Sequence, residues 1–281
     1  MSSRSFGILL VLAAGIGQSQ GQTMKIHTHG GVSEFRLSDI DSITFFIAPT
    51  HNDSDISSGL VLYYPFDQSL LDSSGNANNG GAANQSYTTD HWGGQNSAYL
   101  FNGANNFITV PDNSSLNPSN QLTVTVWLRI DSIQGNYMPM FVKGGPATSD
   151  FSNREYALYS KDNLGYWYPQ WVSAGDGLGK HECLGDHHSY AVGQWVFFAC
   201  VIDRAVNHSM EIFADGALTE HADDSYSSFN TSTYPLIIGW SQEAEGGLPD
   251  NAPFKGAMDN LRIYNRALTP GQILLLYQIH R

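Results

Sequence analysis

Basic residues are scarce in this chain of 281 residues. Lysine and arginine together number 13, against 26 aspartates and glutamates, and the formal net charge at pH 7 is −13. A surface with this balance repels the phosphates of nucleic acids, so we expect no nucleic-acid partner. Only 14% of the residues are charged, and many Asp, Asn and Gly residues fall in turn-like stretches. Such a chain is suited to cations held by oxygen ligands and to neutral polar partners.

Cysteine is scarce as well, which excludes a disulfide-rich scaffold. Of the two cysteines, Cys183 lies in a polar loop and Cys200 lies in the apolar run WVFFACVID. In a secreted protein this pair predicts one disulfide closing a short loop. The alternative is that Cys200 faces the core and never meets Cys183.

Long hydrophobic runs are missing beyond the N-terminus, so we expect no membrane span. Residues 1–21 combine Arg4, an apolar stretch from Phe6 to Ile16 and the small-residue exit GQSQG, which is the pattern of a secretory signal peptide. The apolar stretch is too short to cross a bilayer. We therefore expect a secreted protein, extracellular or at the cell surface. A buried N-terminal strand or helix is the alternative.

The rest of the chain is a succession of short strand patterns separated by turn residues. In residues 122–130 every second residue is apolar, which predicts a strand with one buried face. Residues 196–201 are apolar throughout, as in a central strand covered on both faces. Asp215-Gly216 is the strongest hairpin signal. These patterns predict an all-β fold of two stacked antiparallel sheets.

The composition predicts four segments along the chain. They are a signal peptide (1–21), a short N-terminal β segment (22–47), a polar linker (48–59) and one large domain (60–281). Gly30-Gly31 predicts a hairpin turn within the second segment.

The C-terminal stretch FKGAMDNLRIYNRALTPGQILLLY (254–277) predicts a strand followed by a short helix. Strict alternation places Asp259 on the same face as Leu261 and Ile263. A carboxylate on an apolar face needs a cation or several donors, because burying a bare charge is costly. Thr269 is a good N-cap, and Pro270 suits the first helical position.

This stretch resembles the closing segment of laminin-G-like, concanavalin A-like jelly rolls. The opening stretch LVLYYPFDQSLLDSSGNANNG resembles the first strand and turn of that family, and SAYLFNGANNFITVP, LTVTVWLRI and WVFFACVIDRAVNHSMEIFADG follow in the family's order. The resemblance covers roughly residues 59–281. It implies a two-sheet antiparallel jelly-roll sandwich in which the first and last strands lie side by side.

The resemblance also implies a structural calcium ion, because members of this superfamily often hold a cation between their terminal segments. The matching positions are Asp67, Asp72 and Asp259. Calcium accepts six to eight oxygens in a tolerant geometry, so these side chains with loop carbonyls would suffice. The alternative is that Asp67 and Asp72 cap turns while Asp259 accepts backbone N–H groups.

A lectin-like fold favours a glycan or glycoprotein partner. In LGYWYPQWVS, Trp167 and Trp171 share one side of an extended segment, and flat aromatic rings can pack on the C–H faces of sugars. With His181 nearby, these residues form the predicted ligand site. The alternative is ordinary packing, since tryptophan is heavily buried on average.

The loop KHECLGDHH (180–188) gathers His, Cys, Asp and Glu donors, but its spacing matches none of the usual zinc patterns. We therefore expect a solvated loop there rather than a metal centre.

Catalytic motifs of this and other folds are missing. Glycoside hydrolysis needs two carboxylates about 5–9 Å apart, and the Glu-x-Asp-x-Glu string of glucanases with this architecture does not occur. There is also no G-x-S-x-G elbow and no phosphate-binding loop. We predict no catalytic residues and a carbohydrate-binding, non-enzymatic function. An adhesion module that binds protein, and a polysaccharide hydrolase or lyase, are the alternatives.

Overall fold

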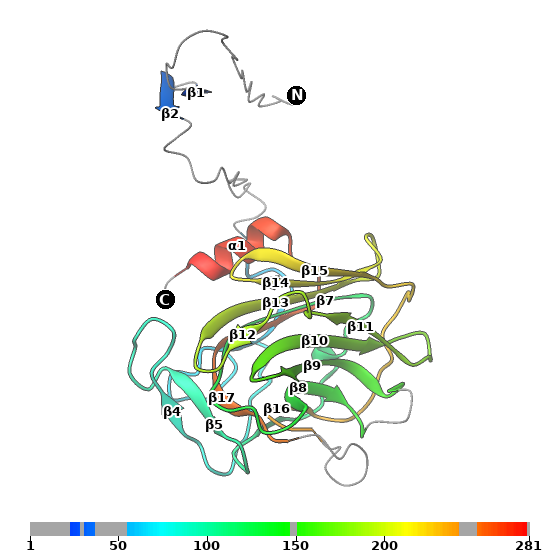
Figure 1. The fold of residues 1–281 in the computed structure, drawn as a ribbon. Coiled ribbons are helices and arrows are strands. Elements are labelled where there is room, and N and C mark those ends of the chain that lie inside the picture. The colour runs from blue at the N-terminus through cyan, green and yellow to red at the C-terminus, as the bar shows by residue number, and fades with distance from the viewer. Residues whose placement is uncertain (1–22, 29–30, 37–54, 147–150, 242–251, 280–281) are drawn as a thin grey trace. The chain divides into compact units, whose positions relative to one another are not determined.

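The structure is a computed structural model that describes residues 23–28, 31–36, 55–146, 151–241 and 252–279, with side chains described from residue 55 onward (Figure 1). The chain divides into two compact units, residues 1–48 and 49–281. The predicted signal peptide and residues 48–54 of the predicted linker lie outside the described residues.

The first unit contains one antiparallel hairpin, made of β1 (Thr23–Thr28) and β2 (Gly31–Arg36). Gly31 belongs to β2 and pairs with Thr28, and residues 29–30 of the predicted turn lie outside the described residues.

The second unit is a sandwich of two antiparallel sheets, which confirms the predicted fold class (Figure 1). The seven-stranded sheet has the order β11 (Lys180–Leu184), β10 (Tyr166–Ala174), β9 (Arg154–Asn163), β8 (Tyr137–Gly144), β16 (Leu236–Ile238) and β6 (Ile108–Val110), with β12 (Tyr190–Ala191) paired to β10. The eight-stranded sheet has the order β15 (Ala217–Asp223), β14 (Ser209–Ala214), β13 (Trp195–Asp203), β7 (Gln121–Ile130), β17 (Lys255–Tyr264), β5 (Ala98–Asn102) and β4 (Tyr87–Thr88), with β3 (Leu60–Tyr64) paired to β17. A single turn of 3₁₀ helix, η2, spans Ser114–Leu116.

The first and last strands of the sandwich lie side by side, as the resemblance implies. Strand β3 pairs antiparallel with β17, with Tyr64 opposite Leu261. Just outside these strands, the Arg266 guanidinium donates to the backbone carbonyls of Asp55 and Ser58. The two ends of the domain are therefore fastened to each other.

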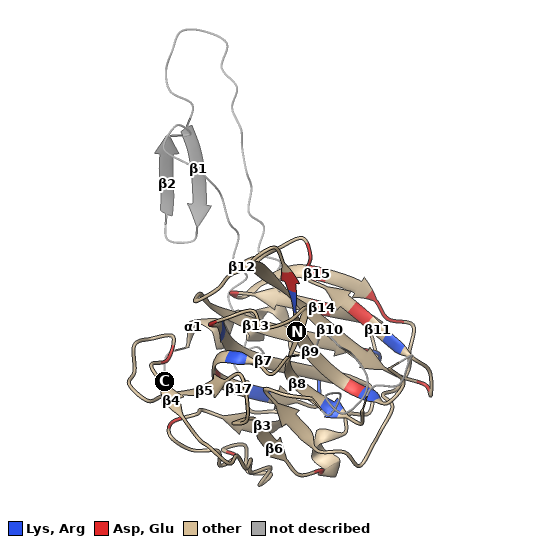
Figure 2. Ribbon diagram, turned by 60° about the horizontal axis from the view of Figure 1, so that its bottom comes forward, with Lys and Arg blue, Asp and Glu red and all other residues tan. Residues whose placement is uncertain are grey.

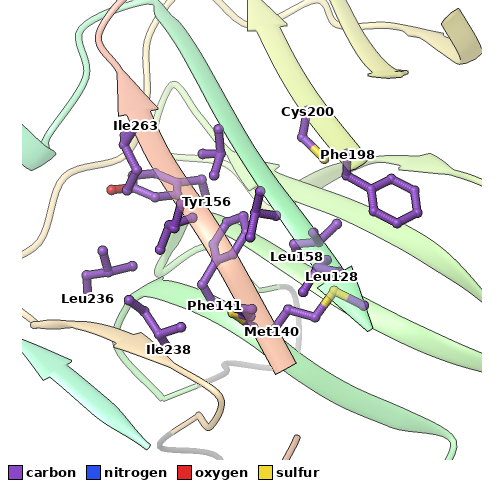
Figure 3. Close-up of a cluster of buried hydrophobic side chains, with 14 of the residues drawn as sticks. Leu128, Met140, Phe141, Tyr156, Leu158, Phe198, Cys200, Leu236, Ile238 and Ile263 are labelled. Atoms are coloured by element: carbon purple, nitrogen blue, oxygen red, sulfur yellow. The ribbon is translucent and has the colours of Figure 1, made fainter. Parts of the chain in front are cut away.

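The main core lies between the two sheets. Figure 3 shows side chains from both layers meeting there, among them Leu128 and Ile263 from the eight-stranded sheet and Phe141, Leu158 and Leu236 from the seven-stranded sheet. All five are at most 1% exposed. Burial of this apolar area is the main stabilising contribution to the sandwich.

A second apolar layer covers the outer face of the eight-stranded sheet. The helix α1 (Pro270–Gln278) begins with the predicted Thr269 N-cap and Pro270, and Gln272 completes a capping box. Its Ile273 and Leu276 belong to a buried cluster with Trp127 on β7. Strand β7 is consequently buried on both faces, and the prediction of one buried face is wrong because the helix covers the other.

Strand β17 contains a bulge that reverses the predicted orientation of Asp259. Its pairing with β7 shifts between Asp259 and Arg262, and Asn260 has a φ of +52°. An extra residue in a strand moves the following side chains to the opposite face. Leu261 and Ile263 therefore lie in the core between the sheets, while Asp259 is opposite Trp127, on the helix-covered face.

Within the described part of the chain, no helix has the length and apolar character needed to cross a membrane.

Candidate functional site

The two tryptophans predicted to bind ligand lie in the core. Trp167 and Trp171 do share one side of β10, but both are 0% exposed. The Trp171 indole N–H donates to the Val201 carbonyl across the sandwich at 3.3 Å, and the Trp167 ring packs 5.5 Å from the Phe198 ring. The prediction of a ligand site on these rings is wrong, because each large apolar side chain is stabilised by burial between the sheets.

His181 lies at the edge of the seven-stranded sheet and is partly exposed. Its Nδ1 is 2.8 Å from Oδ1 of Asp224, and its ring stacks on Tyr226 at a centroid distance of 3.8 Å. The second Asp224 oxygen accepts a hydrogen bond from the buried Arg204. These contacts hold the His181 ring in place. Because Trp167 and Trp171 are buried, the three residues do not form a common exposed binding site.

The other side of β10 offers a different set of residues. Tyr168, Gln170 and Val172 alternate with the buried tryptophans, so they point away from the core. Val172 belongs to a small cluster with Val142, Ala157 and Tyr159, against which Tyr137 packs. We call the side of strands β8 to β11 that surrounds this cluster the outer face. Its partly exposed polar and aromatic residues are Tyr137, Lys161, Lys180 and Glu182, and Tyr168 and Gln170 beside them are 9% and 6% exposed.

Lys161 lies between two aromatic rings of the outer face. Its Nζ is 5.7 Å from the centroid of the Tyr137 ring and 5.7 Å from that of Tyr168. A hydrogen bond with Tyr168 raises the pKa of Lys161, burial opposes this, and Tyr137 adds to the increase. The Lys161 amine is therefore protonated at neutral pH, and the resulting ammonium is attracted to both ring faces.

A second polar group adjoins these rings. Glu182 accepts a hydrogen bond of 2.6 Å from the Gln170 amide and one of 2.7 Å from Lys180. Burial raises the pKa of Glu182, but Lys180 and Gln170 outweigh it and the net effect is a lowered pKa. The carboxylate is therefore ionised at neutral pH. Figure 2 shows basic and acidic positions close together at the β10–β11 end of this sheet.

The outer face can bind a polar ligand that also has apolar surface. The partly exposed Tyr137 ring supplies flat contact area, while the Lys161 ammonium and the Glu182 carboxylate supply a donor and an acceptor. Glu155 of β9 accepts hydrogen bonds from Lys143 and from the Ser232 N–H.

The three predicted calcium ligands do not converge. Asp72 accepts four hydrogen bonds, from the N–H groups of Tyr63, Ser74 and Asn78 and from the Ser74 hydroxyl. These occupy about the four lone-pair sites of a carboxylate. Asp67 is exposed, and Asp259 is 0% exposed with Oδ2 2.7 Å from Nδ1 of His91. Asp72 therefore caps a turn, as the alternative to a calcium site proposes.

Among the described residues, one group of three or more His, Cys, Asp and Glu side chains has its ligand atoms within 4.8 Å of one another. It consists of Asp186, His187 and Glu220, and it does not include Asp67, Asp72 or Asp259. Two of its members lie in the KHECLGDHH loop, which the sequence spacing did not identify as a metal centre.

Cys183 and Cys200 are free and buried, so the predicted disulfide is wrong. Cys183 is on β11 of one sheet and Cys200 is on β13 of the other. Figure 3 shows the Cys200 side chain among the core residues between the sheets. Packed sheets lie about 10 Å apart, whereas a disulfide joins Cα atoms about 4.4–6.8 Å apart.

The sequence between residues 102 and 274 matches the family described as the Concanavalin A-like lectin/glucanases superfamily. No protein with a curated description matches the chain.

Several solved structures share the fold. Domain 4 of AbnA, a GH43 extracellular arabinanase from Geobacillus stearothermophilus solved with arabinotriose, is 23% identical, with 78% of this chain and 98% of that chain covered and a TM-score of 0.56. The botulinum neurotoxin serotype D ligand-binding domain, solved with N-acetylneuraminic acid, is 14% identical, with 80% and 52% covered and a TM-score of 0.60. The binding domain of Paraclostridial Mosquitocidal Protein 1 is 13% identical, with 79% and 52% covered and a TM-score of 0.59.

This chain spans about half the length of the two toxin domains. The family match covers more than half of the chain, and the two antiparallel sheets of the sandwich are consistent with that match. The chain therefore belongs to the concanavalin A-like lectin/glucanases superfamily.

Proposed function

We propose that this protein is a non-catalytic carbohydrate-binding module whose glycan site is the outer face of the seven-stranded sheet. The observation that carries the proposal is the position of the Lys161 ammonium between the rings of Tyr137 and Tyr168. The Gln170–Glu182 pair adjoins this arrangement through β10 and β11. A sugar ring would pack its C–H face on a tyrosine and bond its hydroxyls to the polar groups.

The solved relatives support glycans as the class of ligand. The arabinanase domain was solved with arabinotriose and the neurotoxin domain with N-acetylneuraminic acid, so this fold binds sugars in those proteins. The excess of acidic residues in this chain favours neutral glycans over strongly anionic ones, because like charges repel.

The proposal places the protein outside the cytoplasm. The signal-peptide pattern of residues 1–21 supports secretion. The test is N-terminal sequencing of the protein recovered from the culture medium; a protein that stays in the cells with residues 1–21 attached contradicts this part of the proposal.

A glycan array probed with the purified protein tests the binding function. We expect binding to at least one class of neutral glycan, and a loss of about five- to thirtyfold in affinity in Tyr168→Ala and Lys161→Ala, since each removes a contact worth about 1–2 kcal/mol. The matched control is Trp92→Ala, which removes a 46%-exposed aromatic ring in the β4–β5 loop of the other sheet.

The possible results test the binding function and the location of the glycan site separately. Binding to no glycan by the wild-type protein removes the carbohydrate-binding proposal. Glycan binding that is lost in Trp92→Ala and retained in Tyr168→Ala removes the outer face as the site while keeping the function.

A further inference from the structure

The two sheets meet at one corner of the sandwich through their edge strands. Strand β11 ends the seven-stranded sheet, β15 ends the eight-stranded sheet, and the two strands contact each other. The turn that follows β11 carries Asp186, His187 and His188. The two histidines contact Glu220 of β15, and Asp186 lies beside His187.

The donor atoms of this corner lie close together. His187 Nδ1 is 2.8 Å from Oε2 of Glu220, and His188 Nδ1 is 3.1 Å from Oε1 of the same carboxylate. His187 Nδ1 is also 3.6 Å from Oδ1 of Asp186. The ligand atoms of Asp186, His187 and Glu220 all lie within 4.8 Å of one another, and His188 contacts the other oxygen of Glu220.

Glu220 is the buried member of the group. It is 8% exposed, and the hydrogen bonds of its side chain in the described part of the chain go to the two imidazoles. The ion pairs of Asp186 and Glu220 among the described residues are all with histidine, and none is with lysine or arginine. A buried carboxylate of this kind is costly unless a cation neutralises it.

The electrostatic potential around this group is also negative. Burial raises the pKa of the Cys183 thiol to about 12, and the carboxylates of Glu220, Glu211 and Asp186 contribute to that increase. The local field therefore attracts a cation to this corner.

We propose that Asp186, His187, His188 and Glu220 form a binding site for a divalent transition metal, with zinc as the preferred ion. Zinc is bound in proteins by four nitrogen and oxygen donors of this kind, at about 2.0–2.2 Å in a tetrahedron. The donors of such a tetrahedron lie about 3.4 Å apart. His187 Nδ1 lies 2.8 Å from Glu220 and 3.6 Å from Asp186, so these three residues need only small side-chain movements. His188, which lies outside this group of three, has to turn its ring toward the ion.

The donor set distinguishes this site from the calcium site expected from the family resemblance. Calcium prefers six to eight oxygens, whereas imidazole nitrogens favour zinc, copper and nickel. A zinc ion here would link the turn after β11 to β15 and so fasten one sheet edge to the other. The site is independent of the proposed glycan face.

Isothermal titration of zinc chloride into metal-free protein, prepared without a polyhistidine tag, tests the proposal. We expect one saturable site per chain and a zinc-dependent rise in melting temperature, because a ligand that binds only the folded state stabilises it. Glu220→Gln and the double variant His187→Ala/His188→Ala should each lower the affinity at least about tenfold, since losing even a supporting partner of a metal ligand costs that much.

The control is His221→Ala, next to Glu220, whose imidazole contacts Glu211 and Asp223 instead. It should bind zinc as the wild type does. His187 and His188 are both more than half exposed, so the double variant is expected to fold even if Glu220→Gln does not. Absence of saturable zinc binding in the wild type, or wild-type affinity in the double variant, overturns the proposal.

Discussion

Nδ1 of His91 lies 2.7 Å from Oδ2 of Asp259, and the two side chains are only 2% and 0% exposed. The His91 ring also stacks on Trp127, with the centroids 3.8 Å apart and the planes at 16°. The loop between β4 and β5 thus supplies the imidazole that covers the carboxylate turned outward by the bulge in β17. The contact between His91 and Asp259 is therefore buried beside the Trp127 ring.

Removing this imidazole should destabilise the fold. We expect His91→Phe, which keeps a ring on Trp127, to lower the free energy of unfolding by about 2–4 kcal/mol, because Asp259 loses a hydrogen-bond partner at a buried site. His91→Ala should cost more, since it also removes the stacked ring. Urea denaturation measures both changes. The control Gln95→Ala, exposed in the same loop, should change stability by less than about 0.5 kcal/mol; equal stability of His91→Phe and wild type would contradict the structural role.

The two thiols should be unreactive in the folded protein. Burial raises the pKa of Cys183 to about 12 and that of Cys200 well above its usual value. The thiolate is the reactive species, so we expect no reaction with Ellman's reagent at pH 8 and reaction of both cysteines after denaturation. A reducing agent should leave the melting temperature unchanged. A native mass lower by two hydrogens would show instead that the disulfide forms.

Asp203 should make the stability depend on pH in the acidic range. Burial opposes ionisation, but hydrogen bonds from Gln121 and from the backbone N–H groups of Val206, Ala205 and Asn207 outweigh it and lower the pKa of Asp203. The contribution is therefore full above the unfolded-state pKa of about 3.9 and disappears as the pH falls through the lower folded-state pKa.

The variant Asp203→Asn tests this dependence. At pH 7 we expect it to lower the free energy of unfolding by about 1–2 kcal/mol, because a charged acceptor is replaced by a neutral one. The difference from wild type should shrink as the pH falls below about 4. Urea denaturation across this pH range gives the curve, and a difference that stays constant down to acid unfolding would exclude a role for the charge.

Asp72 should stabilise the turn after β3 without a metal. Replacing it with alanine leaves three N–H groups and a hydroxyl without their acceptor. We expect Asp72→Ala to lower the free energy of unfolding by about 2–3 kcal/mol in EDTA as well as in calcium, and Asp67→Ala, at an exposed position, to have little effect. The calcium ion implied by the family resemblance stays a prediction, and an unchanged wild-type melting temperature after chelation would contradict it.

The structural features that the sequence predicted correctly are those specified by short runs of neighbouring residues. The pairing of the first and last strands follows the family motifs, and the Asp215-Gly216 hairpin joins β14 and β15 as expected. The Thr269 cap and Pro270 begin the helix as predicted. In each case a few neighbouring residues determine the local backbone, so tertiary contacts do not override the pattern.

The errors arise where a distant element changes the environment of a residue. A single extra residue in β17 turned Asp259 to the other face, and the helix α1 covered the polar side of β7. Alternation showed that Trp167 and Trp171 share a side of β10, but it could not show that this side faces the other sheet. The contact of His187 and His188 with Glu220 depends on the meeting of two sheet edges, which local spacing does not contain.

The pairing of β3 with β17 determines when this domain can finish folding. During synthesis, residues 60–64 leave the ribosome almost two hundred residues before their partner strand, as the contact between Tyr63 and Asn260 shows. Until then the growing chain exposes an unpaired apolar segment, and ring closure over such a distance is slow. The pairing of β3 with β17 is therefore a late step in the folding of the sandwich.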